Sequence, residues 1–143
     1  MFIGITGTDG AGKGAVVRYL VEKKGFTHLS SRALISKEVK KRGLRADRET
    51  LRLVANDMRR EHGHDVIVQK ALEVCRETDC KEAVIESIRA VAEVETLKAN
   101  GGLLLAIDAN PELRYKRIIG RGSASDHISY ETFLEQEAIE MND

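Results

Sequence analysis

Short apolar runs alternate with longer segments of helical periodicity along the whole chain. Phe2 to Thr6 form the first run, and Val16, Val17, Leu20 and Val21 then recur at the spacing of one helix face. The same pattern predicts further strands at 26–30, 83–87 and 103–108. Between and after them it predicts helices at 31–42, from 47 to a break at 63, around 67–75, up to 98, from 110 to about 121, and from 129 onward.

This alternation predicts an α/β fold of three layers, in which a parallel sheet of about four strands is covered by helices on both faces. Ligands of such folds bind at the carboxyl ends of the strands. In this chain those ends fall at Gly7, Ser31, 86–89 and 108–110. We therefore expect the chemistry of the protein to gather in these four places.

The first of these places is a glycine-rich segment that contains most of a Walker A pattern, Gly-x4-Gly-Lys. Glycines let the backbone curl around phosphates, its N–H groups and the helix N-terminus attract negative charge, and Lys13 can reach the terminal phosphates. The usual hydroxyl residue after the lysine is absent. The residues predicted to bind the phosphates are Gly7, Thr8, Asp9, Gly10, Ala11, Gly12, Lys13, Gly14 and Ala15.

Composition narrows the class of protein. With 143 residues, 42% apolar and 32% charged, the chain is expected to form one globular domain, residues 1–143. Its formal net charge is zero, so nothing global favours nucleic acid or a membrane surface as a partner. The chain opens on a strand without a signal peptide and has no run of membrane-spanning length, which predicts a cytoplasmic protein.

With this loop, the chain resembles the adenylate kinase and dephospho-CoA kinase-like group of P-loop nucleotide kinases. It is closest to small, poorly characterised nucleotide kinases, and similar domains also occur fused to deoxycytidylate deaminase-like domains. The resemblance implies an ATP-dependent phosphotransferase that uses Mg²⁺ and acts on a small phosphorylated acceptor, a nucleoside monophosphate first of all. It also implies a helical acceptor-binding insert at about 31–77 and a short lid at about 121–130.

The acceptor-side residues follow from the same resemblance. The family segment that holds the acceptor monophosphate matches 30–36, where Ser31 keeps a hydroxyl, Arg32 adds a cation, and Ser36 replaces the family's arginine. After the third strand, Glu86 would organise magnesium and Arg89 would clamp the acceptor phosphate.

The resemblance also assigns residues on the donor side. In the stretch 115–121, Arg117 would stack on the donor adenine and Arg121 would meet the donor phosphates. Lys13, Arg89 and Arg121 are therefore the predicted catalytic residues, and Asp9 is expected on the acceptor side of the loop. Gln136 stands where relatives carry a further lid cation.

Three alternatives remain open at this point. The altered acceptor and lid positions suit a regulatory nucleotide-binding module without catalysis. Dephospho-CoA is a second acceptor, and a dinucleotide-binding domain fits the pattern Gly10-x-Gly12-x-x-Ala15 but gives no reason for Lys13. Relatives continue with one more strand and helix, so we expect either an adjacent C-terminal segment as partner or a sheet that lacks the last strand.

Overall fold

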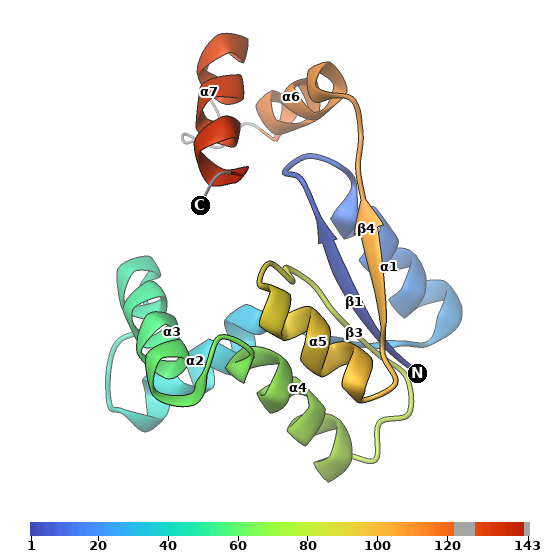
Figure 1. Ribbon diagram of the computed structural model, residues 1–143, viewed down its shortest axis with the longest axis vertical. Coiled ribbons are helices and arrows are strands. Elements are labelled where there is room, and N and C mark those ends of the chain that lie inside the picture. The colour runs from blue at the N-terminus through green and yellow to red at the C-terminus, as the bar shows by residue number, and fades with distance from the viewer. Residues whose placement is uncertain (122–127, 142–143) are drawn as a thin grey trace. The chain divides into compact units, whose positions relative to one another are not determined.

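The computed structural model describes residues 1–121 and 128–141, and it contains a four-stranded parallel sheet in the order β2-β3-β1-β4 (Figure 1). β1 and β3 pair with Phe2 opposite Ala83 and Gly4 opposite Ile85. The predicted parallel sheet is confirmed, although the predicted ends of the later strands lie one or two residues too far out. The strands are β1 (Phe2–Gly7), β2 (Thr27–Leu29), β3 (Ala83–Ile85) and β4 (Leu103–Ile107).

Burial of the strands follows their position in the sheet. All three residues of the central strand β3 are buried, as are Phe2 to Ile5 of β1, because both faces of a parallel sheet are covered by helices. The edge strands are more accessible, and Leu103 of β4 is 49% exposed. The two central strands are therefore the most buried part of the sheet, and they position the loops that follow their carboxyl ends.

Helices cover the two faces of this sheet. The chain moves one way across the sheet from β1 to β2 and the other way from β3 to β4, so right-handed crossovers place α1 (Lys13–Lys24) and α5 (Val91–Ala99) on opposite faces (Figure 1). A Cβ at Gly4 would lie 2.7 Å from the side chain of the fully buried Leu97. Glycine on β1 thus allows α5 to pack directly on the strand.

Three helices lie between β2 and β3, namely α2 (Ser31–Lys41), α3 (Arg48–His62) and α4 (Val66–Glu77). The first two of these helices begin at side-chain caps, and α3 ends at a glycine. Ser30 accepts a hydrogen bond from the Ala33 N–H at 3.2 Å, and Asp47 accepts one from the Thr50 N–H at 2.8 Å. Gly63, with φ +102°, ends α3.

The hydrophobic core joins these helices to the sheet, because α4 packs against α5 and β3. Full burial of one such side chain stabilises a fold by about 1.5–3 kcal/mol. The core residues are Phe2, Leu29, Val39, Val54, Met58, Val66, Ile67, Val68, Ala71, Ala83, Ile85, Ile88 and Leu97.

The chain forms two compact units, which we describe separately. The sheet unit comprises Met1–Thr6 and Gly14–Ala106, and the loop unit comprises Gly7–Lys13 and Ile107–Asp143. The loop unit contains α6 (Pro111–Gly120) and α7 (Tyr130–Met141). The α6 helix begins as predicted, with Pro111 in its first turn and Asn110 accepting a hydrogen bond from the Glu112 N–H at 2.8 Å.

Three aromatic rings hold α6 and α7 together. The Tyr115 ring lies 5.4 Å from the Tyr130 ring and 5.7 Å from the Phe133 ring, measured between centroids. The helix from 129 onward is thereby confirmed, with Ser129 capping it through the Thr132 N–H. Across residues 1–121 and 128–141, we find no helix whose length and apolar character would let it cross a bilayer.

Candidate active site

The glycine-rich segment forms a tight loop between β1 and α1. Gly7 and Gly10 have φ of +151° and +76°. A Cβ at Gly7 would lie 2.1 Å from the Ile107 carbonyl oxygen, and one at Gly10 would lie 2.7 Å from the Arg114 carbonyl oxygen. Both contacts are with backbone atoms, which cannot move aside. These two positions therefore require glycine for conformation and for space.

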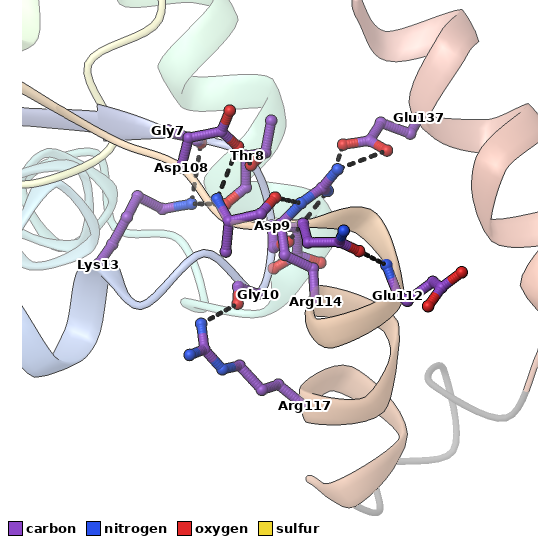
Figure 2. Close-up of polar contacts among 12 residues, drawn as sticks. Gly7, Thr8, Asp9, Gly10, Lys13, Asp108, Glu112, Arg114, Arg117 and Glu137 are labelled. Carbon is purple, nitrogen blue, oxygen red and sulfur yellow. Dashed lines mark hydrogen bonds and ion pairs between the residues drawn. The ribbon is translucent and has the colours of Figure 1, made fainter.

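Lys13 turns its ammonium group back over the start of this loop. Its Nζ donates hydrogen bonds to the carbonyl oxygens of Gly7 at 2.9 Å and Thr8 at 2.8 Å (Figure 2). The Ala11 N–H donates to the same Thr8 oxygen at 3.2 Å and closes the turn. The Lys13 ammonium group is thus held beside the loop backbone, where a phosphate-binding loop requires a cation.

A carboxylate at the end of β4 lies beside the loop. Asp108 Oδ1 accepts a hydrogen bond from the Ala109 N–H at 2.8 Å and one from the Thr8 hydroxyl at 3.0 Å. These bonds, the backbone one first, lower the pKa of the Asp108 carboxyl below its usual range. The sequence pointed to this strand end without giving Asp108 a role, and the structure shows its carboxyl group hydrogen-bonded to the loop hydroxyl.

Arg114 of α6 is buried under the same loop and was not predicted. Its Nε donates to the Ala109 carbonyl oxygen at 2.9 Å, and its two Nη atoms bind the two carboxylate oxygens of Glu137 on α7 (Figure 2). Its Nη1 also lies 3.5 Å from the Asp9 carbonyl oxygen. The residue is 4% exposed, so this guanidinium joins α6, α7 and the loop from inside the unit.

Arg117 of α6 and Arg121, which caps the end of that helix, reach the loop from the surface. Arg117 Nη1 donates to the Gly10 carbonyl oxygen at 3.0 Å, and Arg121 Nη2 lies 3.5 Å from both carboxylate oxygens of Asp9. The structure thus places residues 7–13 of the loop, Arg117 and Arg121 in one unit, whereas Gly14 and Ala15 belong to the sheet unit. Their roles toward a nucleotide stay predictions, and most of the predicted lid, 122–127, lies outside the described residues.

A second group of polar residues lines a pocket of about 450 Å³ in the sheet unit. It contains the predicted acceptor residues Ser31 and Arg89, which are 58 positions apart in the sequence. The sequence interpretation missed its other charged and polar members. The pocket is lined by Ser31, Arg59, His64, Ile67, Ser87, Arg89, Ala90 and Glu93.

The turn from β3 into α5 forms one wall of this pocket. The Ser31 hydroxyl donates to the Glu86 carbonyl oxygen at 3.3 Å and so ties the start of α2 to the end of β3. Ser87 has φ +65°, a conformation that bends the chain sharply. The buried Glu93 carboxylate accepts the N–H groups of Arg89 at 3.1 Å and Ala90 at 2.9 Å, which fixes the turn that carries Arg89.

The remaining predicted residues lie apart from this pocket. Arg32 lines a different hollow beside Ser36. Glu86 Oε1 lies 3.3 Å from His28 Nε2, and its side chain is 35% exposed. Within residues 1–121 and 128–141 no three His, Cys, Asp or Glu side chains are grouped to hold a metal ion. The magnesium role of Glu86 stays a prediction, and its partly accessible carboxylate is of the type that Mg²⁺ binds.

A four-stranded parallel sheet, with a loop rich in glycine and carrying Lys13 between its first strand and the following helix, defines a P-loop protein, a class that binds nucleotides. Comparison with known proteins agrees. The sequence profile of a family described as an AAA domain matches residues 3–142. A UPF0200 protein of Methanococcus maripaludis strain C6 is 34% identical, over 98% of this chain and 78% of the relative. One of Thermococcus onnurineus strain NA1 is 31% identical, over 99% and 79%. The chain therefore belongs to the AAA domain family and to the UPF0200 proteins.

Solved structures show the same fold. TT1252 from Thermus thermophilus superposes with a TM-score of 0.59 and 26% identity, covering 97% of this chain and 79% of the other. A "putative kinase" from Chloroflexus aurantiacus superposes with a TM-score of 0.54 and 20% identity, over 87% and 71%, and at that identity it supports the fold alone. The predicted α/β P-loop fold is confirmed, whereas kinase activity and the narrower adenylate kinase or dephospho-CoA kinase assignment are matters for proposal.

Proposed function

We propose that the protein transfers the γ-phosphoryl group of ATP to a small phosphorylated acceptor, a nucleoside monophosphate. One observation carries the proposal: the chain has two separate sets of cationic groups. The loop with Lys13 suits a nucleoside triphosphate, and the sheet-unit pocket with Arg89 suits a second anion. A protein that only binds or hydrolyses a nucleotide needs the first set and has no use for the second.

The residues divide between donor and acceptor. Lys13 and the loop N–H groups would hold the donor phosphates, Arg121 would stabilise the charge on the transferring group, and Arg117 would contact the donor base. On the acceptor side, Arg89 and Ser31 would hold the phosphate. Bound Mg²⁺ neutralises phosphate charge in such reactions, and Glu86 is the residue proposed to hold it through water.

In this reaction the protein would mainly position the two substrates and neutralise their negative charge. An ionised oxygen of the acceptor phosphate attacks the γ-phosphorus, a new P–O bond forms, and the bond to the β-phosphate oxygen breaks, leaving ADP. No general base is needed because the attacking oxygen carries no proton to remove. Catalysis then comes from fixed cations and N–H donors that meet the transition-state charge.

The alternative is a regulatory module that binds nucleotide without transfer. The replacement of the family's arginine by Ser36 and of a lid cation by Gln136 favours it. The two functions differ in one measurable property, since a module binds ATP but shows no turnover that depends on an acceptor. Dephospho-CoA also belongs among the acceptors to be tested. Its attacking group is a hydroxyl, which would need a nearby carboxylate, and Asp9 is the candidate for that role.

The test is ADP release from ATP and Mg²⁺, with each nucleoside monophosphate and dephospho-CoA added separately. We expect one monophosphate to raise the rate well above the rate with ATP alone. The Lys13→Met variant should lose about 10²–10³-fold of that rate, the usual effect of removing one group that stabilises transition-state charge. ATP binding without stimulation by any acceptor would favour the regulatory module, and full turnover by Lys13→Met would contradict the role of the loop.

A further inference from the structure

The junction between α3 and α4 carries two side chains of the pocket, Arg59 and His64. Arg59 lies in the last turn of α3, and its carbonyl oxygen accepts the Gly63 N–H at 2.9 Å. Gly63 ends the helix with φ +102°, and the Val66 N–H returns to the Gly63 carbonyl oxygen at 3.2 Å. This tight reversal places His64 beside the end of α3 instead of extending the helix.

The residues next to these two face elsewhere. Arg60 is bound to Asp57 on its own helix, and its side chain is 74% exposed. His62 lies 3.8 Å from the carboxylate of Glu61, and its side chain is 62% exposed. Neither residue lines the pocket. The helix thus presents one arginine to the pocket and the adjacent arginine to the outside.

The basic side chains of the pocket are unpaired in the part of the chain that the structure describes. Within residues 1–121 and 128–141, no hydrogen bond or ion pair involves the side chain of Arg59, His64 or Arg89. The acid in the pocket wall, Glu93, accepts two backbone N–H groups on its Oε1 and forms no ion pair with Arg59 or Arg89 in the described part of the chain. Two guanidinium groups in a hollow without a paired carboxylate are typical of a site that receives an anion.

The lining indicates which anion fits. A guanidinium binds two phosphate oxygens at once with its planar fork of donors, and the hydroxyls of Ser31 and Ser87 stand at the same walls. Apolar side chains are few, namely Ile67 and Ala90. A volume of about 450 Å³ lies in the range of ligand pockets. The pocket therefore suits the phosphate and sugar of a phosphomonoester better than a flat apolar base.

We propose that Arg59 and His64, together with Arg89, bind the phosphate of the acceptor and make the protein select a phosphorylated over an unphosphorylated acceptor. This rests on the proposed phosphotransferase function and extends it to residues that the sequence did not indicate. Arg59 supplies from α3 the second guanidinium that position 36 of α2 lacks, because a serine stands there. His64 adds a ring N–H from the turn.

The test compares adjacent residues of the same type. Arg59→Gln is paired with Arg60→Gln, and His64→Asn with His62→Asn, all in a Lys13→Met background so that the loop contributes little to binding. Calorimetric titration with AMP, CMP, GMP and UMP, and with the matching nucleosides, measures affinity without any need for turnover. Thermal unfolding of each variant checks that it folds.

For the best-bound monophosphate we expect at least tenfold weaker binding by Arg59→Gln and about threefold weaker binding by His64→Asn. The two control variants should stay within twofold of their parent. Binding of the unphosphorylated nucleoside should be weak and equal in all five proteins. Should Arg59→Gln fold poorly, Arg59→Lys replaces it, because lysine keeps the charge without the planar fork of donors. Its affinity for the monophosphate should be lower than that of the parent and of Arg60→Gln but still detectable.

Each result separates this proposal from the function it extends. Equal losses in Arg59→Gln and Arg60→Gln, or equal affinity for nucleoside and monophosphate, would overturn the phosphate site even where the wild-type protein shows acceptor-dependent turnover. Failure of all four monophosphates to bind the parent would overturn it too. Binding that depends on Arg59 and the phosphate would uphold the site even where ADP release shows no transfer.

Discussion

The arginines of the loop unit and those of the sheet-unit pocket differ in what they contact. Arg114 and Arg117 on α6 donate to main-chain oxygens of the loop unit, and Arg114 also binds Glu137. In the described part of the chain, Arg59 and Arg89 have no such oxygen partner. The first pair shapes a loop, whereas the second pair is available to a ligand. The same residue type thus bonds to the protein in one unit and is proposed to bind a ligand in the other.

This difference has an energetic meaning. A buried guanidinium is tolerated only when every donor has an acceptor, so Arg114 is held in place by its partners and they by it. Unpaired guanidinium groups that line an open pocket keep their water and lose it when a phosphate binds. Substitutions in the two units should therefore be read out differently, by stability in one and by affinity in the other.

The largest effect is expected for Arg114→Met, which leaves the Glu137 carboxylate without its partner. Breaking a buried pair from one side costs about 3–5 kcal/mol of unfolding free energy. Urea denaturation followed by Tyr fluorescence, since the three tyrosines include Tyr115 and Tyr130 of the loop unit, measures the loss. The double variant Arg114→Met/Glu137→Leu should recover much of it. An Arg114→Met protein as stable as Arg117→Met would contradict a structural role for this pair.

Arg89→Ala should act in the opposite way and leave stability unchanged. A hydrogen bond to a charged group contributes about 1.5–3 kcal/mol, so the acceptor KM should rise about 10- to 100-fold. The KM for ATP should stay within twofold, as should both constants in Arg76→Ala, an exposed arginine on α4. Steady-state kinetics with each substrate varied in turn provide the measurement. Equal losses for both substrates would remove the distinction between donor and acceptor arginines.

A smaller effect is expected where α4 meets α5 through Asp65. Its Oδ2 accepts hydrogen bonds from the Thr96 hydroxyl and from Gln69 Nε2, the latter at 2.7 Å. These bonds, that of Thr96 first, lower the pKa of the Asp65 carboxyl in the folded protein. The stabilisation is therefore complete above the unfolded-state pKa of about 3.9 and is lost as the pH falls through the lower folded value.

Asp65→Asn isolates this contribution. Thermal unfolding between pH 6 and pH 2.5 should show wild type above the variant by no more than about 1.5 kcal/mol at pH 6, with the gap closing in acid. Asn keeps the size of the side chain but cannot ionise, so it serves as the matched control. A gap that is constant across this range would mean that the carboxylate charge does not contribute. The sheet unit would then depend on its apolar core alone at this junction.

The sequence was sufficient for the sheet, for most helices and for the loop because each has a local signal. Apolar runs mark β1 and β3, Asp47 and Gly63 mark the ends of α3, and the glycines around Lys13 mark the loop. Each of these signals depends on neighbouring residues and on steric rules that hold in any fold. The narrower family of kinases and the roles of single residues could not be predicted in the same way, because no local sequence rule determines them.

The two sets of arginines could not be told apart from the sequence. Arg114 and Arg117 lie on α6 and Arg121 caps its end, but Arg114 is the one that is buried and paired with Glu137 of α7. Arg59 and Arg89 line the same pocket although 30 positions of chain separate them, because α3 packs on α4 and α4 packs on β3. His64 is exposed and also lines the pocket. Contacts of this kind depend on tertiary structure.

The most direct test of the proposed reaction follows the phosphoryl group itself. Wild-type protein is incubated with Mg²⁺, ATP labelled in the γ-phosphate and the acceptor that best stimulates ADP release, and the products are separated. We predict that the label appears in the diphosphate of that acceptor, one label for each ADP formed, and that Lys13→Met forms this product about 10²–10³-fold more slowly. Label found solely in ATP or in inorganic phosphate would contradict phosphoryl transfer to a phosphorylated acceptor.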